Sequence, residues 1–172
     1  MSGRTLNFIG AGLIVASVLA GCTPAEDIPA SVSVAQAAPD FELDDLTGKK
    51  VRLSDFKGKV VLVDFWATYC LPCHEAIPEL QALQDKFRDK GLEVVGISVD
   101  AYTGHVPEFV AEHGMKYAVV LDPDQSTAKS YGFSQLPTTF LIGRDGKIIR
   151  KWLGYDNAIG EEIRTQVAAS LG

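Results

Sequence analysis

One segment of the 172-residue chain restricts its fold more than any other: an apolar run that leads directly into two cysteines three positions apart. Residues Lys59 to Trp66 are nearly all apolar and rich in β-branched side chains, which predicts a strand covered on both faces of a parallel or mixed sheet. A turn of three residues separates this strand from Cys70 and Cys73. The residues that follow have apolar side chains at helical spacings of three and four: Ile77, Leu80, Leu83 and Phe87. We therefore expect Cys70 to lie where an amphipathic helix begins.

The alternation of strand and helix continues to the C-terminus and predicts an α/β fold. Further strands are expected at 92–99, 117–121, 138–142 and 147–152, of which the last two form a hairpin. Helices are expected at 106–114, from a turn at 122–124 to Gly132, and at 157–171. Segments 41–43 and 50–53 form a small leading hairpin. This order predicts a central mixed β-sheet flanked by helices.

The N-terminus reads as an export signal that ends in a lipidation site. The apolar stretch 8–20 is about 13 residues long, which suits a signal peptide and is short of the roughly 20 residues of a membrane-spanning helix. The sequence Leu-Ala-Gly-Cys at 19–22 resembles the processing site of bacterial lipoproteins, in which Cys22 would carry the lipid. The predicted organisation is a signal peptide at 1–21, a flexible tether at 22–37 and one domain at 38–172. An uncleaved signal anchor is the alternative, and both interpretations place the domain outside the cytoplasm.

The charges of the chain do not suit a nucleic-acid partner. Its 16 Lys and Arg residues are outnumbered by 22 Asp and Glu residues, and the sequence contains no long basic run. With 47% hydrophobic and 22% charged residues, the composition is that of a globular protein. We expect one globular domain and no binding of nucleic acid.

The spacing of Cys70 and Cys73 favours redox chemistry over a structural role. A structural disulfide stabilises a protein most when it closes a long loop, and this loop is too short for that. Three other uses of the pair stay open on spacing alone. The first is zinc, which would need four ligands. The second is c-type haem, because Cys-Leu-Pro-Cys followed by His74 matches its attachment motif. The third is copper, which two thiolates with His74 could bind. Because His105 and His113 are scattered and the motif follows a strand, we expect no metal and no cofactor.

Two motifs together resemble the thioredoxin superfamily. Residues 65–73 read FWATYCLPC and residues 136–140 read LPTTF. The leading APDF at 38–41, the segment LSDFKGK at 53–59, and an extra helix and strand before Pro137 are similar to the narrower TlpA/ResA-like group of membrane-tethered extracytoplasmic oxidoreductases. The resemblance covers about Ala38 to the C-terminus. It implies a thioredoxin fold with an N-terminal β-hairpin and a central αβ insertion.

The residues and the resemblance together assign roles in the site. Cys70 is expected to be the nucleophile, because unpaired amides at a helix start stabilise a thiolate. Cys73, one turn further and more buried, is placed to resolve the mixed disulfide. The resemblance implies a cis peptide bond before Pro137, and it implies that Asp64, a carboxylate within the apolar strand, acts as general base for Cys73. The alternatives are a trans hairpin proline and a solvated strand end.

Four neighbours of the cysteines are expected around the site: Trp66, Tyr69, Pro72 and His74. Pro72 suits the first turn of the helix, where its missing N–H costs nothing. Trp66 is expected to form a wall of the site or to pack in the core, and His74 to modulate Cys73 or to be a solvated helix residue. The chain departs from the group at Tyr69, where Trp is common, and at Ala76, where an acid is common. No role is assigned to Glu75, His105 or His113.

The resemblance implies a disulfide reductase that works outside the cytoplasm. Its expected partners are a membrane thiol-disulfide electron donor and disulfide-containing exported proteins, with cytochrome c maturation as one setting, and the lipid on Cys22 would hold it at a membrane. The alternatives are a dithiol oxidase or isomerase, a peroxiredoxin-like peroxidase and a copper-binding metallochaperone. Thr68 lies two residues before Cys70, whereas peroxiredoxins have a threonine three residues before their cysteine.

Overall fold

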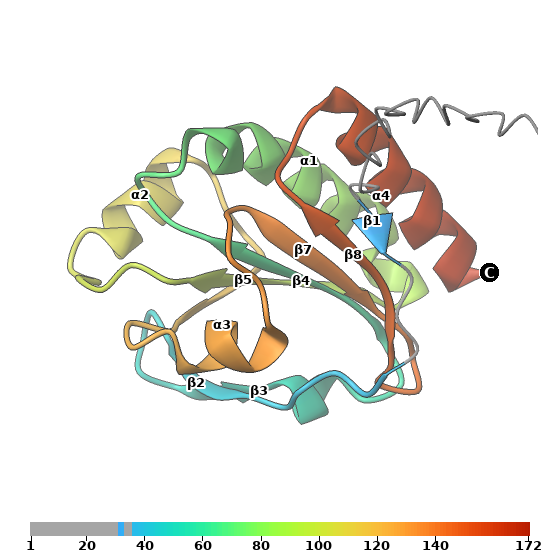
Figure 1. The fold of residues 1–172 in the computed structure, drawn as a ribbon, viewed down its shortest axis with the longest axis horizontal. Helices are drawn as coiled ribbons and strands as arrows, with labels where there is room; N and C mark the ends of the chain where they lie inside the picture. The colour runs from blue at the N-terminus through green and yellow to red at the C-terminus, as the bar shows by residue number, and fades with distance from the viewer. Residues whose placement is uncertain (1–30, 33–35) are drawn as a thin grey trace, which may run out of the picture.

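A computed structural model describes residues 31–32 and 36–172 (Figure 1). The predicted signal peptide and Cys22 lie outside the described residues. Eight strands form one mixed sheet in the order β1-β8-β7-β4-β5-β6-β2-β3. The strands are β1 (Ser31–Val32), β2 (Glu42–Asp45), β3 (Lys50–Arg52), β4 (Val60–Trp66), β5 (Leu92–Ser98), β6 (Ala118–Leu121), β7 (Thr138–Ile142) and β8 (Ile148–Leu153). Strands β4, β5 and β6 run parallel, and the remaining neighbours pair antiparallel.

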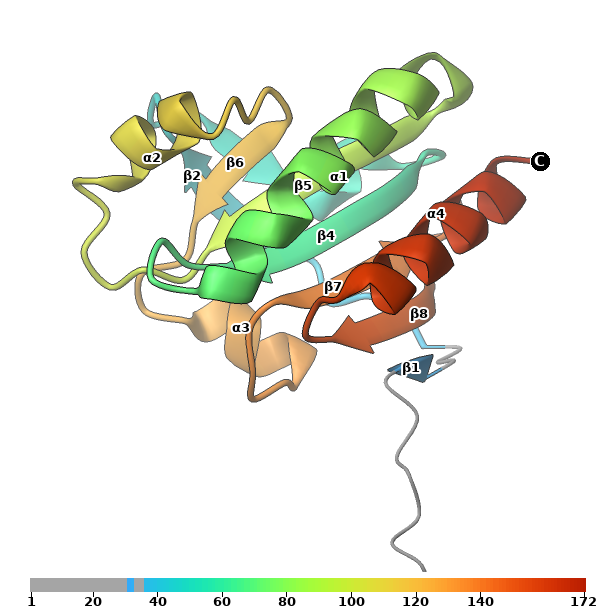
Figure 2. The ribbon, with the colours of Figure 1, turned by 90° about the horizontal axis from the view of Figure 1, so that it is seen from above.

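Within the described residues, four α-helices and two short 3-10 helices accompany these strands. They are η1 (Leu53–Phe56), α1 (Leu71–Phe87), η2 (Arg88–Lys90), α2 (Val106–Glu112), α3 (Ser126–Tyr131) and α4 (Asn157–Leu171). In Figures 1 and 2, α1 and α4 lie side by side over one face of the sheet, and α3 lies against the opposite face. This arrangement is the thioredoxin-type α/β fold that the sequence predicts, with the β2–β3 hairpin at one edge and the α2–β6 insertion beside it.

Strand β4 is central to the sheet and all seven of its residues are buried. Successive side chains point to opposite faces. The Phe65 ring meets Tyr131 of α3, with centroids 5.1 Å apart, whereas the Trp66 ring stacks on Phe109 of α2 at 5.1 Å. Asp64 is two residues before Trp66 and therefore faces the same side of the sheet, the side that α1 and α2 cover.

The chain before Ala38 contributes to the sheet. Ser31 and Val32, which belong to the predicted flexible tether, pair with β8. The carbonyl oxygen of Gln36 accepts a hydrogen bond of 2.9 Å from the Ile148 N–H, and Ala37 forms a bridge with Lys147. Ordered pairing thus begins ahead of the predicted domain boundary, because the outer edge of β8 offers free backbone groups.

Across the described part of the chain, no helix combines the length and the apolar character needed to cross a membrane.

Candidate active site

The paired cysteines lie where β4 passes through a turn into α1. Cys70 is the residue that precedes the first turn of the helix, and its sulfur is bonded to that of Cys73. The Cys70 side chain is 7% exposed and that of Cys73 is 0% exposed. Cys70 is therefore the more accessible of the two cysteines, and the assignment of Cys70 as nucleophile and Cys73 as resolving cysteine stays a prediction. Pro72 lies in the first turn of the helix, where no N–H is needed.

A groove of about 640 Å³ runs beside Cys70. One wall is formed by the cysteine turn, and its most exposed side chains are Tyr69 and Leu71, at 69% and 75% exposure. The opposite wall is formed by residues of α3 and the loop that follows it, ending at Leu136. The Leu136–Pro137 peptide bond is cis, as the resemblance implies. Cys70 lines this groove.

Asp64 is fully buried in the middle of the sheet. Its Oδ1 accepts a hydrogen bond of 2.8 Å from the Thr139 hydroxyl, and its Oδ2 has no hydrogen-bond partner among the described residues. The pKa of Asp64 is raised to about 7, because the effect of burial is larger than the opposite effect of the Thr139 hydrogen bond. Burial, followed by the charge of Asp64, also raises the pKa of Tyr117. The alternative of a solvated strand end is therefore wrong for Asp64, and the carboxyl group can exchange a proton near neutral pH.

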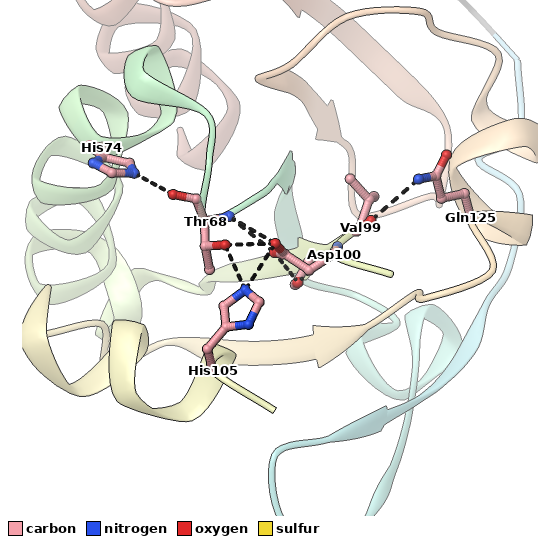
Figure 3. A network of polar contacts seen from close by, with 7 residues as sticks. Thr68, His74, Val99, Asp100, His105 and Gln125 are labelled. Atoms are coloured by element: carbon pink, nitrogen blue, oxygen red, sulfur yellow. Dashed lines mark hydrogen bonds and ion pairs between the residues drawn. The ribbon is translucent and has the colours of Figure 1, made fainter. Parts of the chain in front are cut away.

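A second buried carboxylate, that of Asp100, lies against the turn before Cys70 (Figure 3). It accepts hydrogen bonds from the Thr68 backbone N–H at 3.0 Å and from the Thr68 hydroxyl at 2.7 Å. The His105 Nε2 is 2.9 Å from the same hydroxyl and 3.5 Å from Asp100 Oδ1. The sequence alone assigns no role to His105 and does not single out Asp100. One feature of the sequence could have indicated this cluster: Thr68 follows β4 and Asp100 follows β5. The carboxyl ends of neighbouring parallel strands meet at one edge of a sheet, so residues just after them lie close together.

His74 and Trp66 lie on the buried side of the same turn. His74 Nε2 donates to the Thr68 carbonyl oxygen at 2.9 Å, and its ring contacts those of Phe109 and His113. His74 is thus half-buried and bonded, which contradicts the alternative of a solvated helix residue. Trp66 is fully buried, so it packs in the core beneath the site and does not line the groove.

The neighbouring acid, Glu75, is exposed on the next turn of α1. Within the described ranges, no group of three or more His, Cys, Asp or Glu side chains is arranged to hold a metal ion.

The mixed sheet, the disulfide at the helix start and the cis Leu136–Pro137 bond at the end of the groove wall define a thioredoxin-fold thiol-disulfide oxidoreductase. The profile of the AhpC/TSA family matches residues 34–151. A thiol-disulfide oxidoreductase ResA from Bacillus thuringiensis strain Al Hakam is 36% identical over 140 residues, which cover 81% of this chain and 78% of that protein. ResA from Bacillus subtilis strain 168 is 39% identical over 120 residues, which cover 70% of this chain and 67% of that protein.

A solved structure gives the same result. A candidate thiol:disulfide interchange protein DsbE from Chlorobium tepidum superposes with a TM-score of 0.78 at 40% sequence identity, covering 80% of this chain and 97% of the other. The chain therefore belongs to the AhpC/TSA family, as a ResA-like thiol-disulfide oxidoreductase of thioredoxin fold.

Proposed function

We propose that this protein reduces disulfides in exported proteins on the outer face of a bacterial cytoplasmic membrane or in the periplasm. The observation that carries the proposal is the Cys70–Cys73 disulfide at a helix start, with only Cys70 open to a groove that a polypeptide can enter. The N-terminal sequence supports the location: residues 1–21 would be the signal peptide, Cys22 the lipidated residue and the segment after it the tether. The domain from about Ala38 onward performs the exchange.

The reaction starts from the reduced protein and consumes one disulfide. The Cys70 thiolate attacks a sulfur of the substrate disulfide, so that a mixed disulfide forms and the other substrate sulfur leaves as a thiolate. Cys73, after losing its proton, attacks the Cys70 sulfur and releases the second substrate thiolate. The protein is left with the Cys70–Cys73 disulfide seen in the structure. A membrane-bound dithiol donor would then return two electrons by the same exchange in reverse.

Asp64 is proposed as the base that takes the proton from Cys73. The support is its complete burial, its place on the face of the sheet that α1 covers, and a pKa of about 7. A group with this pKa can accept and return a proton at physiological pH. Replacing Asp64 by Asn should slow the resolving step about tenfold or more near pH 7. An unchanged rate of disulfide reduction across pH would refute this role.

A trapping experiment tests the proposed function. Replacing Cys73 by Ala in the full chain removes the resolving thiol, so a substrate should stay disulfide-bonded to Cys70 in cells. The matched control also carries Cys70→Ser, which cannot form the mixed disulfide. Exported proteins with disulfides, captured by the first variant alone, are the expected result, and apocytochrome c among them would place the protein in cytochrome c maturation. Capture of nothing, or of the same proteins by both variants, would contradict the proposal.

Two related activities are separated by other measurements. A reductase requires a low CxxC reduction potential and a dithiol oxidase or isomerase requires a high one. A peroxidase activity is the alternative raised by the resemblance of the leading segment to peroxiredoxins. Against it, the Thr68 hydroxyl is bonded to Asp100 and His105. We expect the purified protein to consume hydrogen peroxide no faster than free thiols do.

A further inference from the structure

We propose that Asp100 and His105 are positioning residues that hold the turn before Cys70, through Thr68, in the orientation that thiolate attack requires. The proposal rests on the proposed exchange at Cys70. In Figure 3, Thr68 lies at the centre of the network, with Asp100 and His105 on one side and His74 on the other. These four side chains come from separate segments: the cysteine turn, the loop after β5, the start of α2 and α1 itself.

All three polar groups of Thr68 are engaged. Its backbone N–H and its hydroxyl both bond to Asp100, at 3.0 and 2.7 Å. Its carbonyl oxygen accepts from His74 at 2.9 Å. A residue held by its N–H, its carbonyl and its side chain has little rotational freedom left. Thr68 is two residues before the attacking cysteine, so this restriction acts on the backbone that places the Cys70 sulfur.

The hydroxyl of Thr68 also places a proton on Nε2 of His105. A hydroxyl has a single proton, and Thr68 gives it to the carboxylate of Asp100, which can only accept. The hydroxyl must therefore accept from His105, whose Nε2 carries a proton at a distance of 2.9 Å. His105 is either neutral with its proton on Nε2 or fully protonated, and in the second case it pairs with Asp100 at 3.5 Å. In both forms, His105 keeps the Thr68 hydroxyl pointing at Asp100.

Asp100 is well compensated for a buried acid. Its Oδ2 accepts from the Ser98 hydroxyl at 2.9 Å as well as from the Thr68 N–H. In the described part of the chain, His105 is the basic side chain within ion-pair distance of Asp100. The other titratable side chains around the network are Tyr102, whose ring is 5.5 Å from that of His105, and His113 behind His74.

The same segment also reaches the opposite wall of the groove. Val99 lines the groove, and its carbonyl oxygen accepts from the Gln125 Nε2 at 3.4 Å. Gln125 stands at the start of α3 with a positive φ of 57°, a conformation that is uncommon outside glycine. The segment Val99–Asp100 is thus bonded both to the cysteine turn and to the far wall. The network therefore sets the spacing of the two walls as well as the position of Cys70.

The consequence for the chemistry is that the Cys70 thiolate is stabilised. The amides at the start of α1 stabilise a thiolate only if the sulfur faces them. Among the described residues, the Cys70 backbone N–H bonds to Ala67 within the turn, and no side chain caps this end of α1. The side chains of Asp100, His105 and His74 therefore anchor the turn to the rest of the protein through their bonds to Thr68.

The test is the rate at which iodoacetamide alkylates Cys70 in the reduced full chain, purified in detergent and followed from pH 5 to 10 by mass spectrometry of the Cys70 peptide. Thr68→Val keeps the side-chain volume but removes the hydroxyl that joins Asp100 to His105. We expect alkylation at pH 7 to slow about tenfold, which corresponds to a rise of about one unit in the pKa of Cys70. Thr68→Ser restores the hydroxyl and should return the rate to within about twofold of the original.

Two controls make the outcome decisive. Thr47 also donates its hydroxyl to an aspartate, Asp45, at 2.6 Å in the β2–β3 hairpin, so Thr47→Val removes a similar bond away from the site and should leave the rate unchanged. If Thr68→Val does not fold, His105→Phe and His105→Gln replace the pair, since Gln can still donate to Thr68 and Phe cannot. A pKa of Cys70 unchanged by Thr68→Val or His105→Phe, or equal slowing in Thr68→Ser, would overturn the proposal. Because alkylation needs no protein substrate, these results are independent of the trapping experiment.

Discussion

Replacing Asp64 by Asn changes how the stability of the protein depends on pH. Asp64 is fully buried on β4, and burial raises its pKa from 3.8 to about 7. The folded protein thus binds the proton of Asp64 more tightly than the unfolded chain does. The contribution of protonated Asp64 to stability is complete below about pH 4, decreases as the pH rises, and is lost once the pH passes the folded pKa near 7.

The size of the effect follows from the difference between the two pKa values. A change from 3.8 to about 7 corresponds to roughly 4 kcal/mol of unfolding free energy, to order of magnitude. The amide of Asn does not titrate, so the Asp64→Asn protein lacks this dependence. The difference in unfolding free energy between the two proteins should therefore shift by roughly 4 kcal/mol in favour of the Asn variant between pH 4 and pH 8. Other titrating groups contribute equally to both proteins and cancel in the difference.

The measurement is urea unfolding of the oxidised full chain, followed by tryptophan fluorescence at several pH values from 4 to 8.5. Thr139→Val is the matched second variant, because it removes the 2.8 Å hydrogen bond that lowers the pKa of Asp64. The pKa of Asp64 should therefore be higher in this variant, and the decrease in its stability with rising pH should continue to a higher pH than in the original protein. A change of less than about 1 kcal/mol over this range in the free-energy difference between the original and Asn proteins would contradict a raised pKa of Asp64.

Three further predictions concern other parts of the chain. Cys22→Ala should abolish incorporation of radiolabelled palmitate in cells, and label that persists on this variant would exclude a lipid on Cys22. Gly96→Ala places a methyl group 3.0 Å from the Trp66 Nε1 and 3.1 Å from the Tyr117 ring, so urea unfolding should give a loss of about 1–3 kcal/mol. An unfolding free energy equal to that of the original protein would mean that these rings move freely. Asp122→Ala removes a fully buried carboxylate that accepts two backbone N–H bonds from α3, and should cost about 2–3 kcal/mol; a loss below about 0.5 kcal/mol would contradict this role.

Local patterns in the sequence predict most of the fold. The apolar run 59–66 becomes β4 at Val60–Trp66, and the spacing of Ile77, Leu80 and Leu83 becomes the buried face of α1. These predictions succeed because strand and helix periodicities depend on neighbouring residues alone. The position of Cys70 before the first turn of a helix follows from the same patterns.

Some features of the site and of the sheet could not be predicted from these patterns. Trp66 could face the groove or the core, and only the position of Phe109 on α2 decides for the core. The pairing of Ser31 and Val32 with β8 depends on which strand forms the edge of the sheet. The burial of Asp64 depends on the strands and the helix around it.

The sequence by itself determines where the cysteine pair lies, because a pair at the junction of a strand and a helix is encoded within fifteen consecutive residues, 59–73. The tertiary structure alone decides what surrounds that pair. Asp100 is 32 positions from Thr68 and His105 is 37 positions from it, yet their side chains meet. They meet because β4 and β5 are parallel neighbours whose carboxyl ends lie together, and hydrogen bonds form between groups that are close in space, whatever their separation along the chain.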